Sequence, residues 1–195
     1  MTPPDPGRTT PCPPPAGLHQ IDTATNTVTK TLPVAPNPHW VAFTPDGRFA
    51  YTANHESNLI TVLDVATKTV VGAVRVGSSP HSVAVSPTEP LVANVNYDGH
   101  SVSIIDTRTN TVTETIRHVG AHPQALAWAP DGHHVYTANV DDGTVSVVNT
   151  ESMKVTARIP TGKSPTSVAV DPSGQNAYVA NLRSGTLTVL KIGRS

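Results

Sequence analysis

The sequence predicts an all-β protein, a β-propeller of four blades with four antiparallel strands in each blade. Three sequence markers recur along the chain with one period of about 42 residues. Within that period no segment has the 3.6-residue spacing of an amphipathic helix. Four short strands in a repeat of this length are typical of a propeller blade.

The three markers keep the same period independently of one another. The first is a proline before an apolar run, at Pro38, Pro80, Pro123 and Pro165. The second is an asparagine at the end of the next run, at Asn54, Asn96, Asn139 and Asn181. The third is a polar residue after the third run, at Asp22, Asp64, Asp106, Asn149 and Lys191. Their agreement indicates a repeat architecture.

One repeat, residues 38 to 76, illustrates the four expected strands. The apolar run Trp40–Phe43 is typical of a strand that is buried on both faces. We expect the second strand at Phe49–Ala53. The β-branched run Leu59–Leu63 predicts the third strand, and Val70–Val76 the fourth.

The connections between these strands have the composition of tight turns. The string Pro-Asp-Gly at 45–47 returns at 130–132, where proline presets φ and glycine accepts a positive φ. In the segments that start at Asp22, Asp64 and Asp106, we expect the carboxylate to form an Asx-turn. The second repeat departs from the pattern, because Thr88-Glu89-Pro90 replaces the Asp-Gly pair. We therefore expect a reshaped first hairpin there.

Several strings resemble the YVTN family of β-propeller repeats, which is related to WD40-like repeats. They are PHSVAVSP, PDGHHVYTANVDDGTVSVVNT and YVANLRSGTLTV. The resemblance covers Leu18 to Ile192 and is specific for architecture rather than activity. It implies a bacterial surface-type or extracytoplasmic role. The N-terminus, however, lacks the basic start and apolar stretch of a signal peptide.

The chain divides into a Pro-rich tail at 1–17, expected to be disordered, and a propeller domain at 18–195. The segment Thr27–Leu32 has the pattern of a fourth strand, whereas Thr186–Lys191, near the C-terminus, has that of a third. We therefore expect the N-terminal strand to complete the C-terminal blade and close the ring. Two alternatives stay open: a fragment of a longer ring, or two chains that pair into a larger one. The protein is accordingly expected to be a monomer or a homodimer.

Composition argues against several classes of function. The net charge is −1 and only 14% of the residues are charged, which gives no reason to expect a nucleic-acid partner. No apolar run approaches the ~20 residues of a membrane span. The single cysteine, Cys12, lies in the tail. The chain contains no G-x-S-x-G elbow and no phosphate-binding glycine loop. We predict no catalytic residues and no cofactor.

In a propeller of this topology, the inter-blade links and the links between second and third strands meet at one face. Binding residues concentrate on such loops. The candidates on this loop face are His39, His55, His81, Tyr97, Asp98, His100, His122, Gln124, Asp141 and Asp142.

Two functions are open for this face. The first is a non-catalytic binding or scaffold module, which presents the variable loops to a protein or surface partner. The alternative is an enzyme or metal site at the mouth of the central channel, with His39, His81 and His122 as metal candidates. The histidines could also serve only to hydrogen-bond neighbouring blades.

Overall fold

A computed structural model describes residues 17–193, which form 17 β-strands. The all-β prediction is thus confirmed. In this part of the chain no helix is long and apolar enough to span a membrane. Of the Pro-rich tail at 1–17, which was expected to be disordered, residues 1–16 lie outside the described residues, and Cys12 is among them.

The strands form five antiparallel sheets. Three sheets are four-stranded. The first of these contains β3 (Pro38–Phe43), β4 (Phe49–Asn54), β5 (Leu59–Asp64) and β6 (Thr69–Arg75). The second contains β7 (Pro80–Val85), β8 (Leu91–Asn96), β9 (Ser101–Asp106) and β10 (Thr111–Arg117). The third contains β11 (Pro123–Trp128), β12 (His134–Asn139), β13 (Thr144–Asn149) and β14 (Lys154–Pro160).

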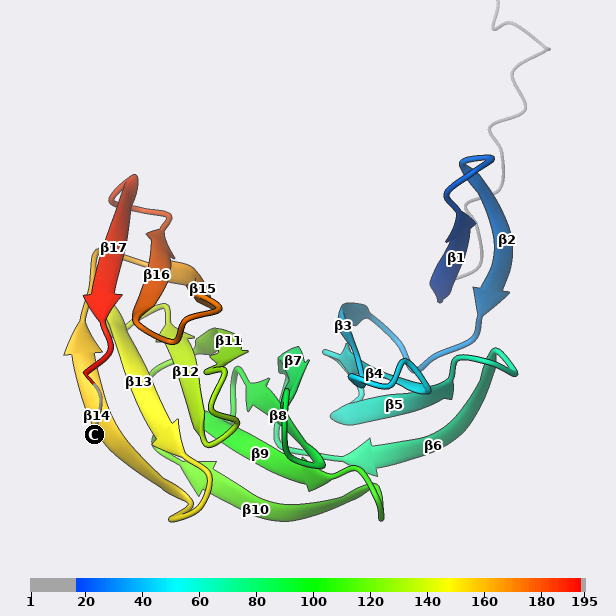
Figure 1. Ribbon diagram of the computed structural model, residues 1–195, viewed down its shortest axis with the longest axis horizontal. Coiled ribbons are helices and arrows are strands. Elements are labelled where there is room, and N and C mark those ends of the chain that lie inside the picture. The colour runs from blue at the N-terminus through cyan, green and yellow to red at the C-terminus, as the bar shows by residue number, and fades with distance from the viewer. Residues whose placement is uncertain (1–16, 194–195) are drawn as a thin grey trace, which may run out of the picture.

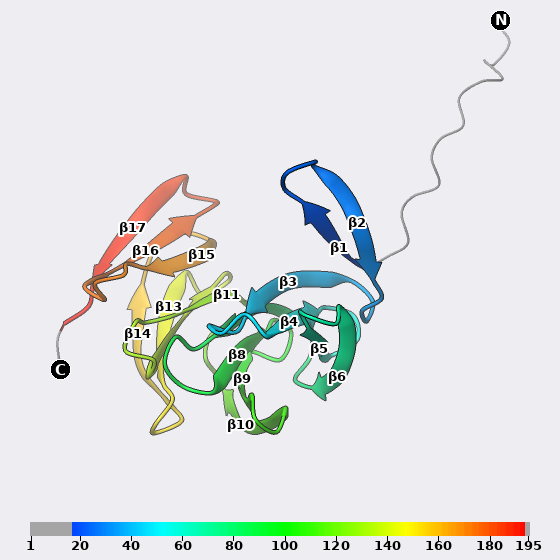
Figure 2. The ribbon, with the colours of Figure 1, turned by 45° about the vertical axis from the view of Figure 1, so that its right-hand side comes forward.

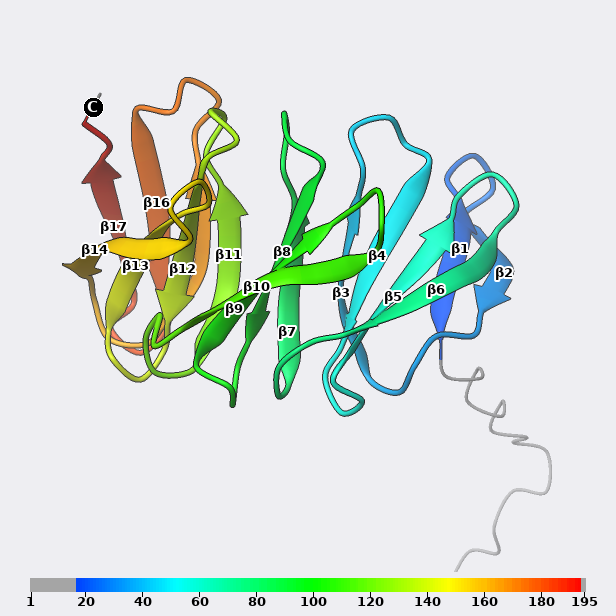
Figure 3. The same ribbon diagram turned by 90° about the horizontal axis from the view of Figure 1, so that it is seen from below.

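The two remaining sheets are incomplete and lie at the ends of the array. One has three strands, β15 (Pro165–Val170), β16 (Asn176–Asn181) and β17 (Thr186–Lys191). The other has two, β1 (Leu18–Asp22) and β2 (Thr27–Leu32). The sheets follow an open arc, with β1–β2 at one end and β15–β17 at the other (Figure 1). Seen from below, they stand side by side in chain order (Figure 3).

The expected turn chemistry is present in the structure. Gly47 and Gly132 have φ of 68° and 74°, and each backbone N–H closes its turn onto the residue three positions before. Asp64 Oδ1 accepts a hydrogen bond of 2.7 Å from the Thr67 backbone N–H, which is the expected Asx-turn. In the divergent second repeat, Ser86 Oγ accepts hydrogen bonds from the backbone N–H groups of residues 88 and 89.

The hydrophobic core lies between successive sheets. One cluster joins the first two four-stranded sheets and includes Tyr51 and Val83, both fully buried. A second cluster joins the next pair, where Trp128 packs and its indole Nε1–H donates to the Ala84 carbonyl at 3.0 Å. The molecule is therefore stabilised by side chains packed between blades, as expected for a propeller.

Within residues 17–193 the predicted closure of the ring is not formed. β2 pairs with β1 alone, and the sheet β15–β16–β17 ends at β17. Figure 2 shows the β1–β2 hairpin standing at its own end of the arc, away from β17. A turn of four residues makes the hairpin a local contact with a small loop-closure cost. Pairing with β17 would have to bring the two ends of the arc together.

Candidate functional site

Six ring side chains gather on the loop face and form what we call the imidazole cluster. Its members are His39, His55, His81, Tyr97, His100 and His122. The centroids of His39 and His81 lie 4.2 Å apart, and His55 lies 5.3 Å from His39. The Tyr97 ring is 5.6 Å from His81 and stacks on His122 at 4.6 Å. The rings thus form one continuous chain across blades.

β-Bulges place the innermost residues of the cluster. In β3 the pairing with β4 shifts register between Pro38 and Trp40, and His39 is left without a partner. The same shift occurs around His81 in β7 and Gln124 in β11. A bulge bends the strand and re-aims the extra side chain. The repeat therefore presents His39, His81 and Gln124 at equivalent places, one residue after each repeated proline, and only the bulge was not visible in the sequence pattern.

The remaining rings come from loops at the ends of strands. His55 and Tyr97 directly follow β4 and β8, whereas His122 directly precedes β11. His100 and His122 have φ of 48° and 51°, in the left-handed region. The His122 backbone N–H donates to His100 Nδ1 at 3.1 Å, which ties two loops together. The cluster is thus assembled between blades rather than within one.

Burial and charge set the protonation of the cluster's centre. Desolvation, followed by the neighbouring charge of His39, lowers the pKa of His81 to about 4. His81 is therefore neutral at pH 7, and its Nδ1 is buried without a hydrogen-bond partner among the described residues. Burial, with Asp141 and Asp98 nearby, raises the pKa of the Tyr97 hydroxyl.

The three predicted carboxylates lie at the rim, exposed to solvent. Asp141 Oδ2 lies 2.6 Å from His122 Nδ1, and Asp98 accepts a hydrogen bond from the Ser79 hydroxyl. Asp142 instead accepts from the Ala121 backbone N–H at 2.7 Å. The structure therefore brings Asp98 and Asp141 to the cluster, whereas Asp142 fixes a loop.

The cluster predicts a pH effect on stability. Unfolded histidine has a pKa of about 6.5, so between that value and about 4 the unfolded state binds a proton that folded His81 does not. Stability is therefore lost as the pH falls through this range. We expect His81→Gln, which copies Gln124 of the next blade, to lose less stability than wild type between about pH 7 and pH 5. Urea unfolding at both pH values measures this.

His19→Gln serves as the matched control, because His19 is exposed on β1 and lies outside the cluster. It should keep the pH response of wild type. If His81→Gln and wild type lose the same stability on acidification, the burial argument for His81 is wrong.

The repeated asparagines that end the second strand of each sheet have a different role from the rings. Asn54, Asn96 and Asn139 are fully buried, and Asn181 nearly so. Each amide donates to a hydroxyl of the third strand of its own sheet, as Asn139 Nδ2 does to Ser146 Oγ at 3.0 Å. They hold the second and third strands of each sheet together.

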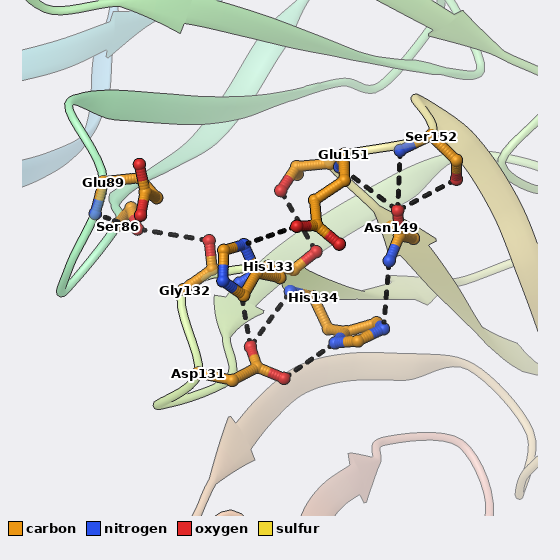
Figure 4. A network of polar contacts seen from close by, with 10 residues as sticks. Ser86, Glu89, Asp131, Gly132, His133, His134, Asn149, Glu151 and Ser152 are labelled. Carbon is orange, nitrogen blue, oxygen red and sulfur yellow. Dashed lines mark hydrogen bonds and ion pairs between the residues drawn. The ribbon is translucent and has the colours of Figure 1, made fainter. Parts of the chain in front are cut away.

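A polar network on the opposite face was missed by the sequence analysis. Asp131 Oδ2 lies 2.7 Å from His134 Nδ1, and His134 Nε2 lies 3.3 Å from Asn149 Nδ2 (Figure 4). His133 reaches Glu151 at 3.8 Å in the same view. In the sequence, the string Pro-Asp-Gly indicated only a turn. The two histidines that follow it were the signal that could have pointed to this network.

Asp131 and His134 border a cavity of about 550 Å³ between β14 and β17. Its apolar wall includes Val147, Ile159 and Leu190. Leu190 of β17 lies in its wall, and within residues 17–193 no fourth strand pairs with β17.

No group of three or more His, Cys, Asp or Glu side chains within residues 17–193 is arranged to hold a metal ion. His39 and His81 lie together, but the Tyr97 ring stands between His81 and His122. The three metal candidates therefore do not form a preassembled set in this conformation.

The repeated four-stranded sheets and the loop-face cluster define a β-propeller protein. Residues 17–125 match the family model described as "Cytochrome D1 heme domain", and residues 105–195 match "Lactonase, 7-bladed beta-propeller". The first match covers more than half of the chain, which therefore belongs to the cytochrome D1 heme domain family of β-propellers.

A solved structure shares this fold at low sequence identity. A functionally unknown protein from Desulfotomaculum acetoxidans DSM 771 is 18% identical with a TM-score of 0.71, over 85% of this chain and 58% of that one. The chain thus spans less than two thirds of that protein. Hydrazine synthase from Kuenenia stuttgartiensis is 16% identical with a TM-score of 0.48, over 90% and 89% of the two chains. No curated protein matches the sequence.

The family name raises the question of a haem. Haem iron takes an axial ligand such as histidine, and the macrocycle needs a cavity with room for both of its faces. The rings of His39 and His81 pack on each other at 4.2 Å, and His55 packs on both. Three cavities among the described residues are lined by segments outside this cluster. The imidazole cluster therefore does not fit a haem.

Proposed function

We propose that the protein is a non-catalytic binding module of the YVTN type, which presents its loop face to a protein partner at a surface. The observation that carries the proposal is the imidazole cluster, six rings from three consecutive blades that meet on one face. Flat rings with polar edges provide contact area with little loss of side-chain entropy on binding.

The surroundings of the cluster support binding rather than chemistry. Asp141 is held by His122 and Asp98 by the Ser79 hydroxyl, so both carboxylates are tied to neighbouring loops. A binding face that is fixed in this way loses little freedom when a partner arrives. Because His81 is uncharged at pH 7, the centre of this face fits a partner segment that contributes aromatic and amide groups.

Panning a library of random 12-residue peptides tests this function. We expect peptides enriched on the immobilised 195-residue protein to lose binding to the variant His39→Ala/Tyr97→Ala. They should keep binding to His133→Ala, which alters the opposite face. Failure to enrich any peptide, or equal binding to both variants, would contradict the proposal.

A metal site is the second candidate function. It is favoured by the 4.2 Å approach of the His39 and His81 rings together with the buried, unpartnered Nδ1 of His81. Two imidazoles suit zinc, copper or nickel. Calorimetric titration with these three ions should give heat with wild type and none with His39→Ala/His81→Ala. The same heat with both proteins removes this candidate.

A further inference from the structure

β17 has an unused hydrogen-bonding edge. It pairs with β16 on one side, and within residues 17–193 no strand pairs with it on the other. In the three four-stranded sheets, the equivalent strands β5, β9 and β13 each pair with a fourth strand on this side. An open edge of this kind is a template for pairing with another strand.

β2 is a fourth strand that lacks its sheet. Its register with β1 joins Asp22 to Thr27, just as β5 and β6 join Asp64 to Thr69. In both pairs the register then shifts one residue pair further from the turn. The β1–β2 hairpin thus copies a third and a fourth strand, whereas β15–β17 supply a first, a second and a third.

At the two ends of the arc, side chains that are buried between blades elsewhere in the chain are exposed. Leu187 on β17 is 62% exposed, whereas Val145, its equivalent on β13, is fully buried. Phe43 on β3 is 58% exposed, whereas the equivalent Trp128 is 9% exposed. Inside the chain, the second strand of each blade contacts the first strand of the next, as β4 does β7. The exposed face of the last sheet, β15–β17, therefore matches the exposed face of the first strand β3 at the other end of the arc.

The space next to β17 also suits a strand. The cavity of about 550 Å³ lies between β14 and β17, with Ile159 and Leu190 in its wall. In the complete sheets the fourth strand buries Val74 and Ile116. Leu32 occupies the equivalent position in β2.

We propose that two copies of this chain close head to tail into one ring. β17 of each copy takes the place of β1 beside β2 of the other copy, and the exposed face of β16 and β17 packs on β3 of that copy. The two copies contribute three four-stranded sheets each and share two more, which gives eight blades. That number is within the range of propellers. The β17 edge of each copy and the apolar faces at both ends are then covered, and β1 gives up its pairing with β2 in the exchange.

Molar mass in solution tests the assembly. Light scattering on the 195-residue protein should give about twice the chain mass of 20.4 kDa. Leu187→Lys puts a charge into the shared interface and should give the single-chain mass. Val71→Lys is the matched control on β6, where a similarly exposed valine lies outside the interface, and it should stay dimeric. A monomeric wild type, or a dimeric Leu187→Lys, overturns the proposal.

A disulfide tests the exchanged strand itself. By the repeat, Lys30 and Val189 correspond to Gly72 and Val62, where a Cβ at Gly72 would lie 3.8 Å from Val62 Cβ. That separation is typical of a disulfide. In a Cys12→Ser background, Lys30→Cys/Val189→Cys should form covalent dimers on mild oxidation, at least tenfold more than Lys30→Cys/Thr113→Cys. A bond within one chain, or no excess over that control, overturns the exchange.

Discussion

Gly132→Val is expected to destabilise the protein by about 2–4 kcal/mol. Gly132 closes the turn between β11 and β12 with φ of 74°, where a β-branched side chain is strained. A Cβ at this position would also overlap Thr88 Oγ1 and lie 3.1 Å from Thr88 Cβ, on the neighbouring blade. The substitution therefore adds a steric clash between blades to the backbone strain.

Gly47→Val is the matched control for this prediction. Gly47 occupies the same turn position in the first blade with φ of 68°, but nothing lies within 4 Å of its Cβ position. We expect this change to cost only the strain, about 1–2 kcal/mol. Denaturant unfolding of both variants measures the difference. Equal losses would mean that the neighbouring blade plays no part at Gly132.

Asn139→Ala is expected to cost about 3 kcal/mol of stability. The amide is fully buried, and its Nδ2 lies 3.2 Å from the Val119 carbonyl and 3.0 Å from Ser146 Oγ. Its Oδ1 accepts from the Thr137 hydroxyl at 3.1 Å. Removing the side chain leaves the buried Thr137 hydroxyl without its acceptor, while Ser146 Oγ keeps only its bond to the Val119 carbonyl. A buried unpaired polar group costs more than the bond itself contributes.

Asn181→Ala tests whether burial is the cause. Asn181 has the same place in the last blade and donates to Thr186 and Thr188, of which Thr186 is exposed. Water can replace the lost amide there, so we expect about 1 kcal/mol. Thermal or urea unfolding compares the two variants. A loss at Asn181 as large as that at Asn139 would contradict the burial argument.

The sequence predicted much of the local structure because turn chemistry is local. The positive φ of Gly47 and Gly132 and the Asx-turn of Asp64 follow from residues two to four positions apart. The strand positions followed from the repeat, since one period fixes every copy of an element. The loop-face histidines could also be predicted, because in a propeller successive connections between strands lie alternately on the two faces.

The sequence did not predict how these side chains meet. The stacking of Tyr97 on His122 and the lowered pKa of His81 depend on loops from different blades. The bulges that leave His39 and His81 unpaired are invisible in a period-two pattern. The Asp131–His134 contact was hidden inside a string that indicated only a turn.

By itself the sequence determined an all-β repeat protein with blade-sized units and a loop face rich in histidine. Only the tertiary structure decided that the array is an open arc, because closure depends on where the two ends of the chain lie in space. β2 satisfies its hydrogen bonds with β1 through a short turn, since a local hairpin has a smaller loop-closure cost than a contact across the arc. That preference leaves the edge of β17 open.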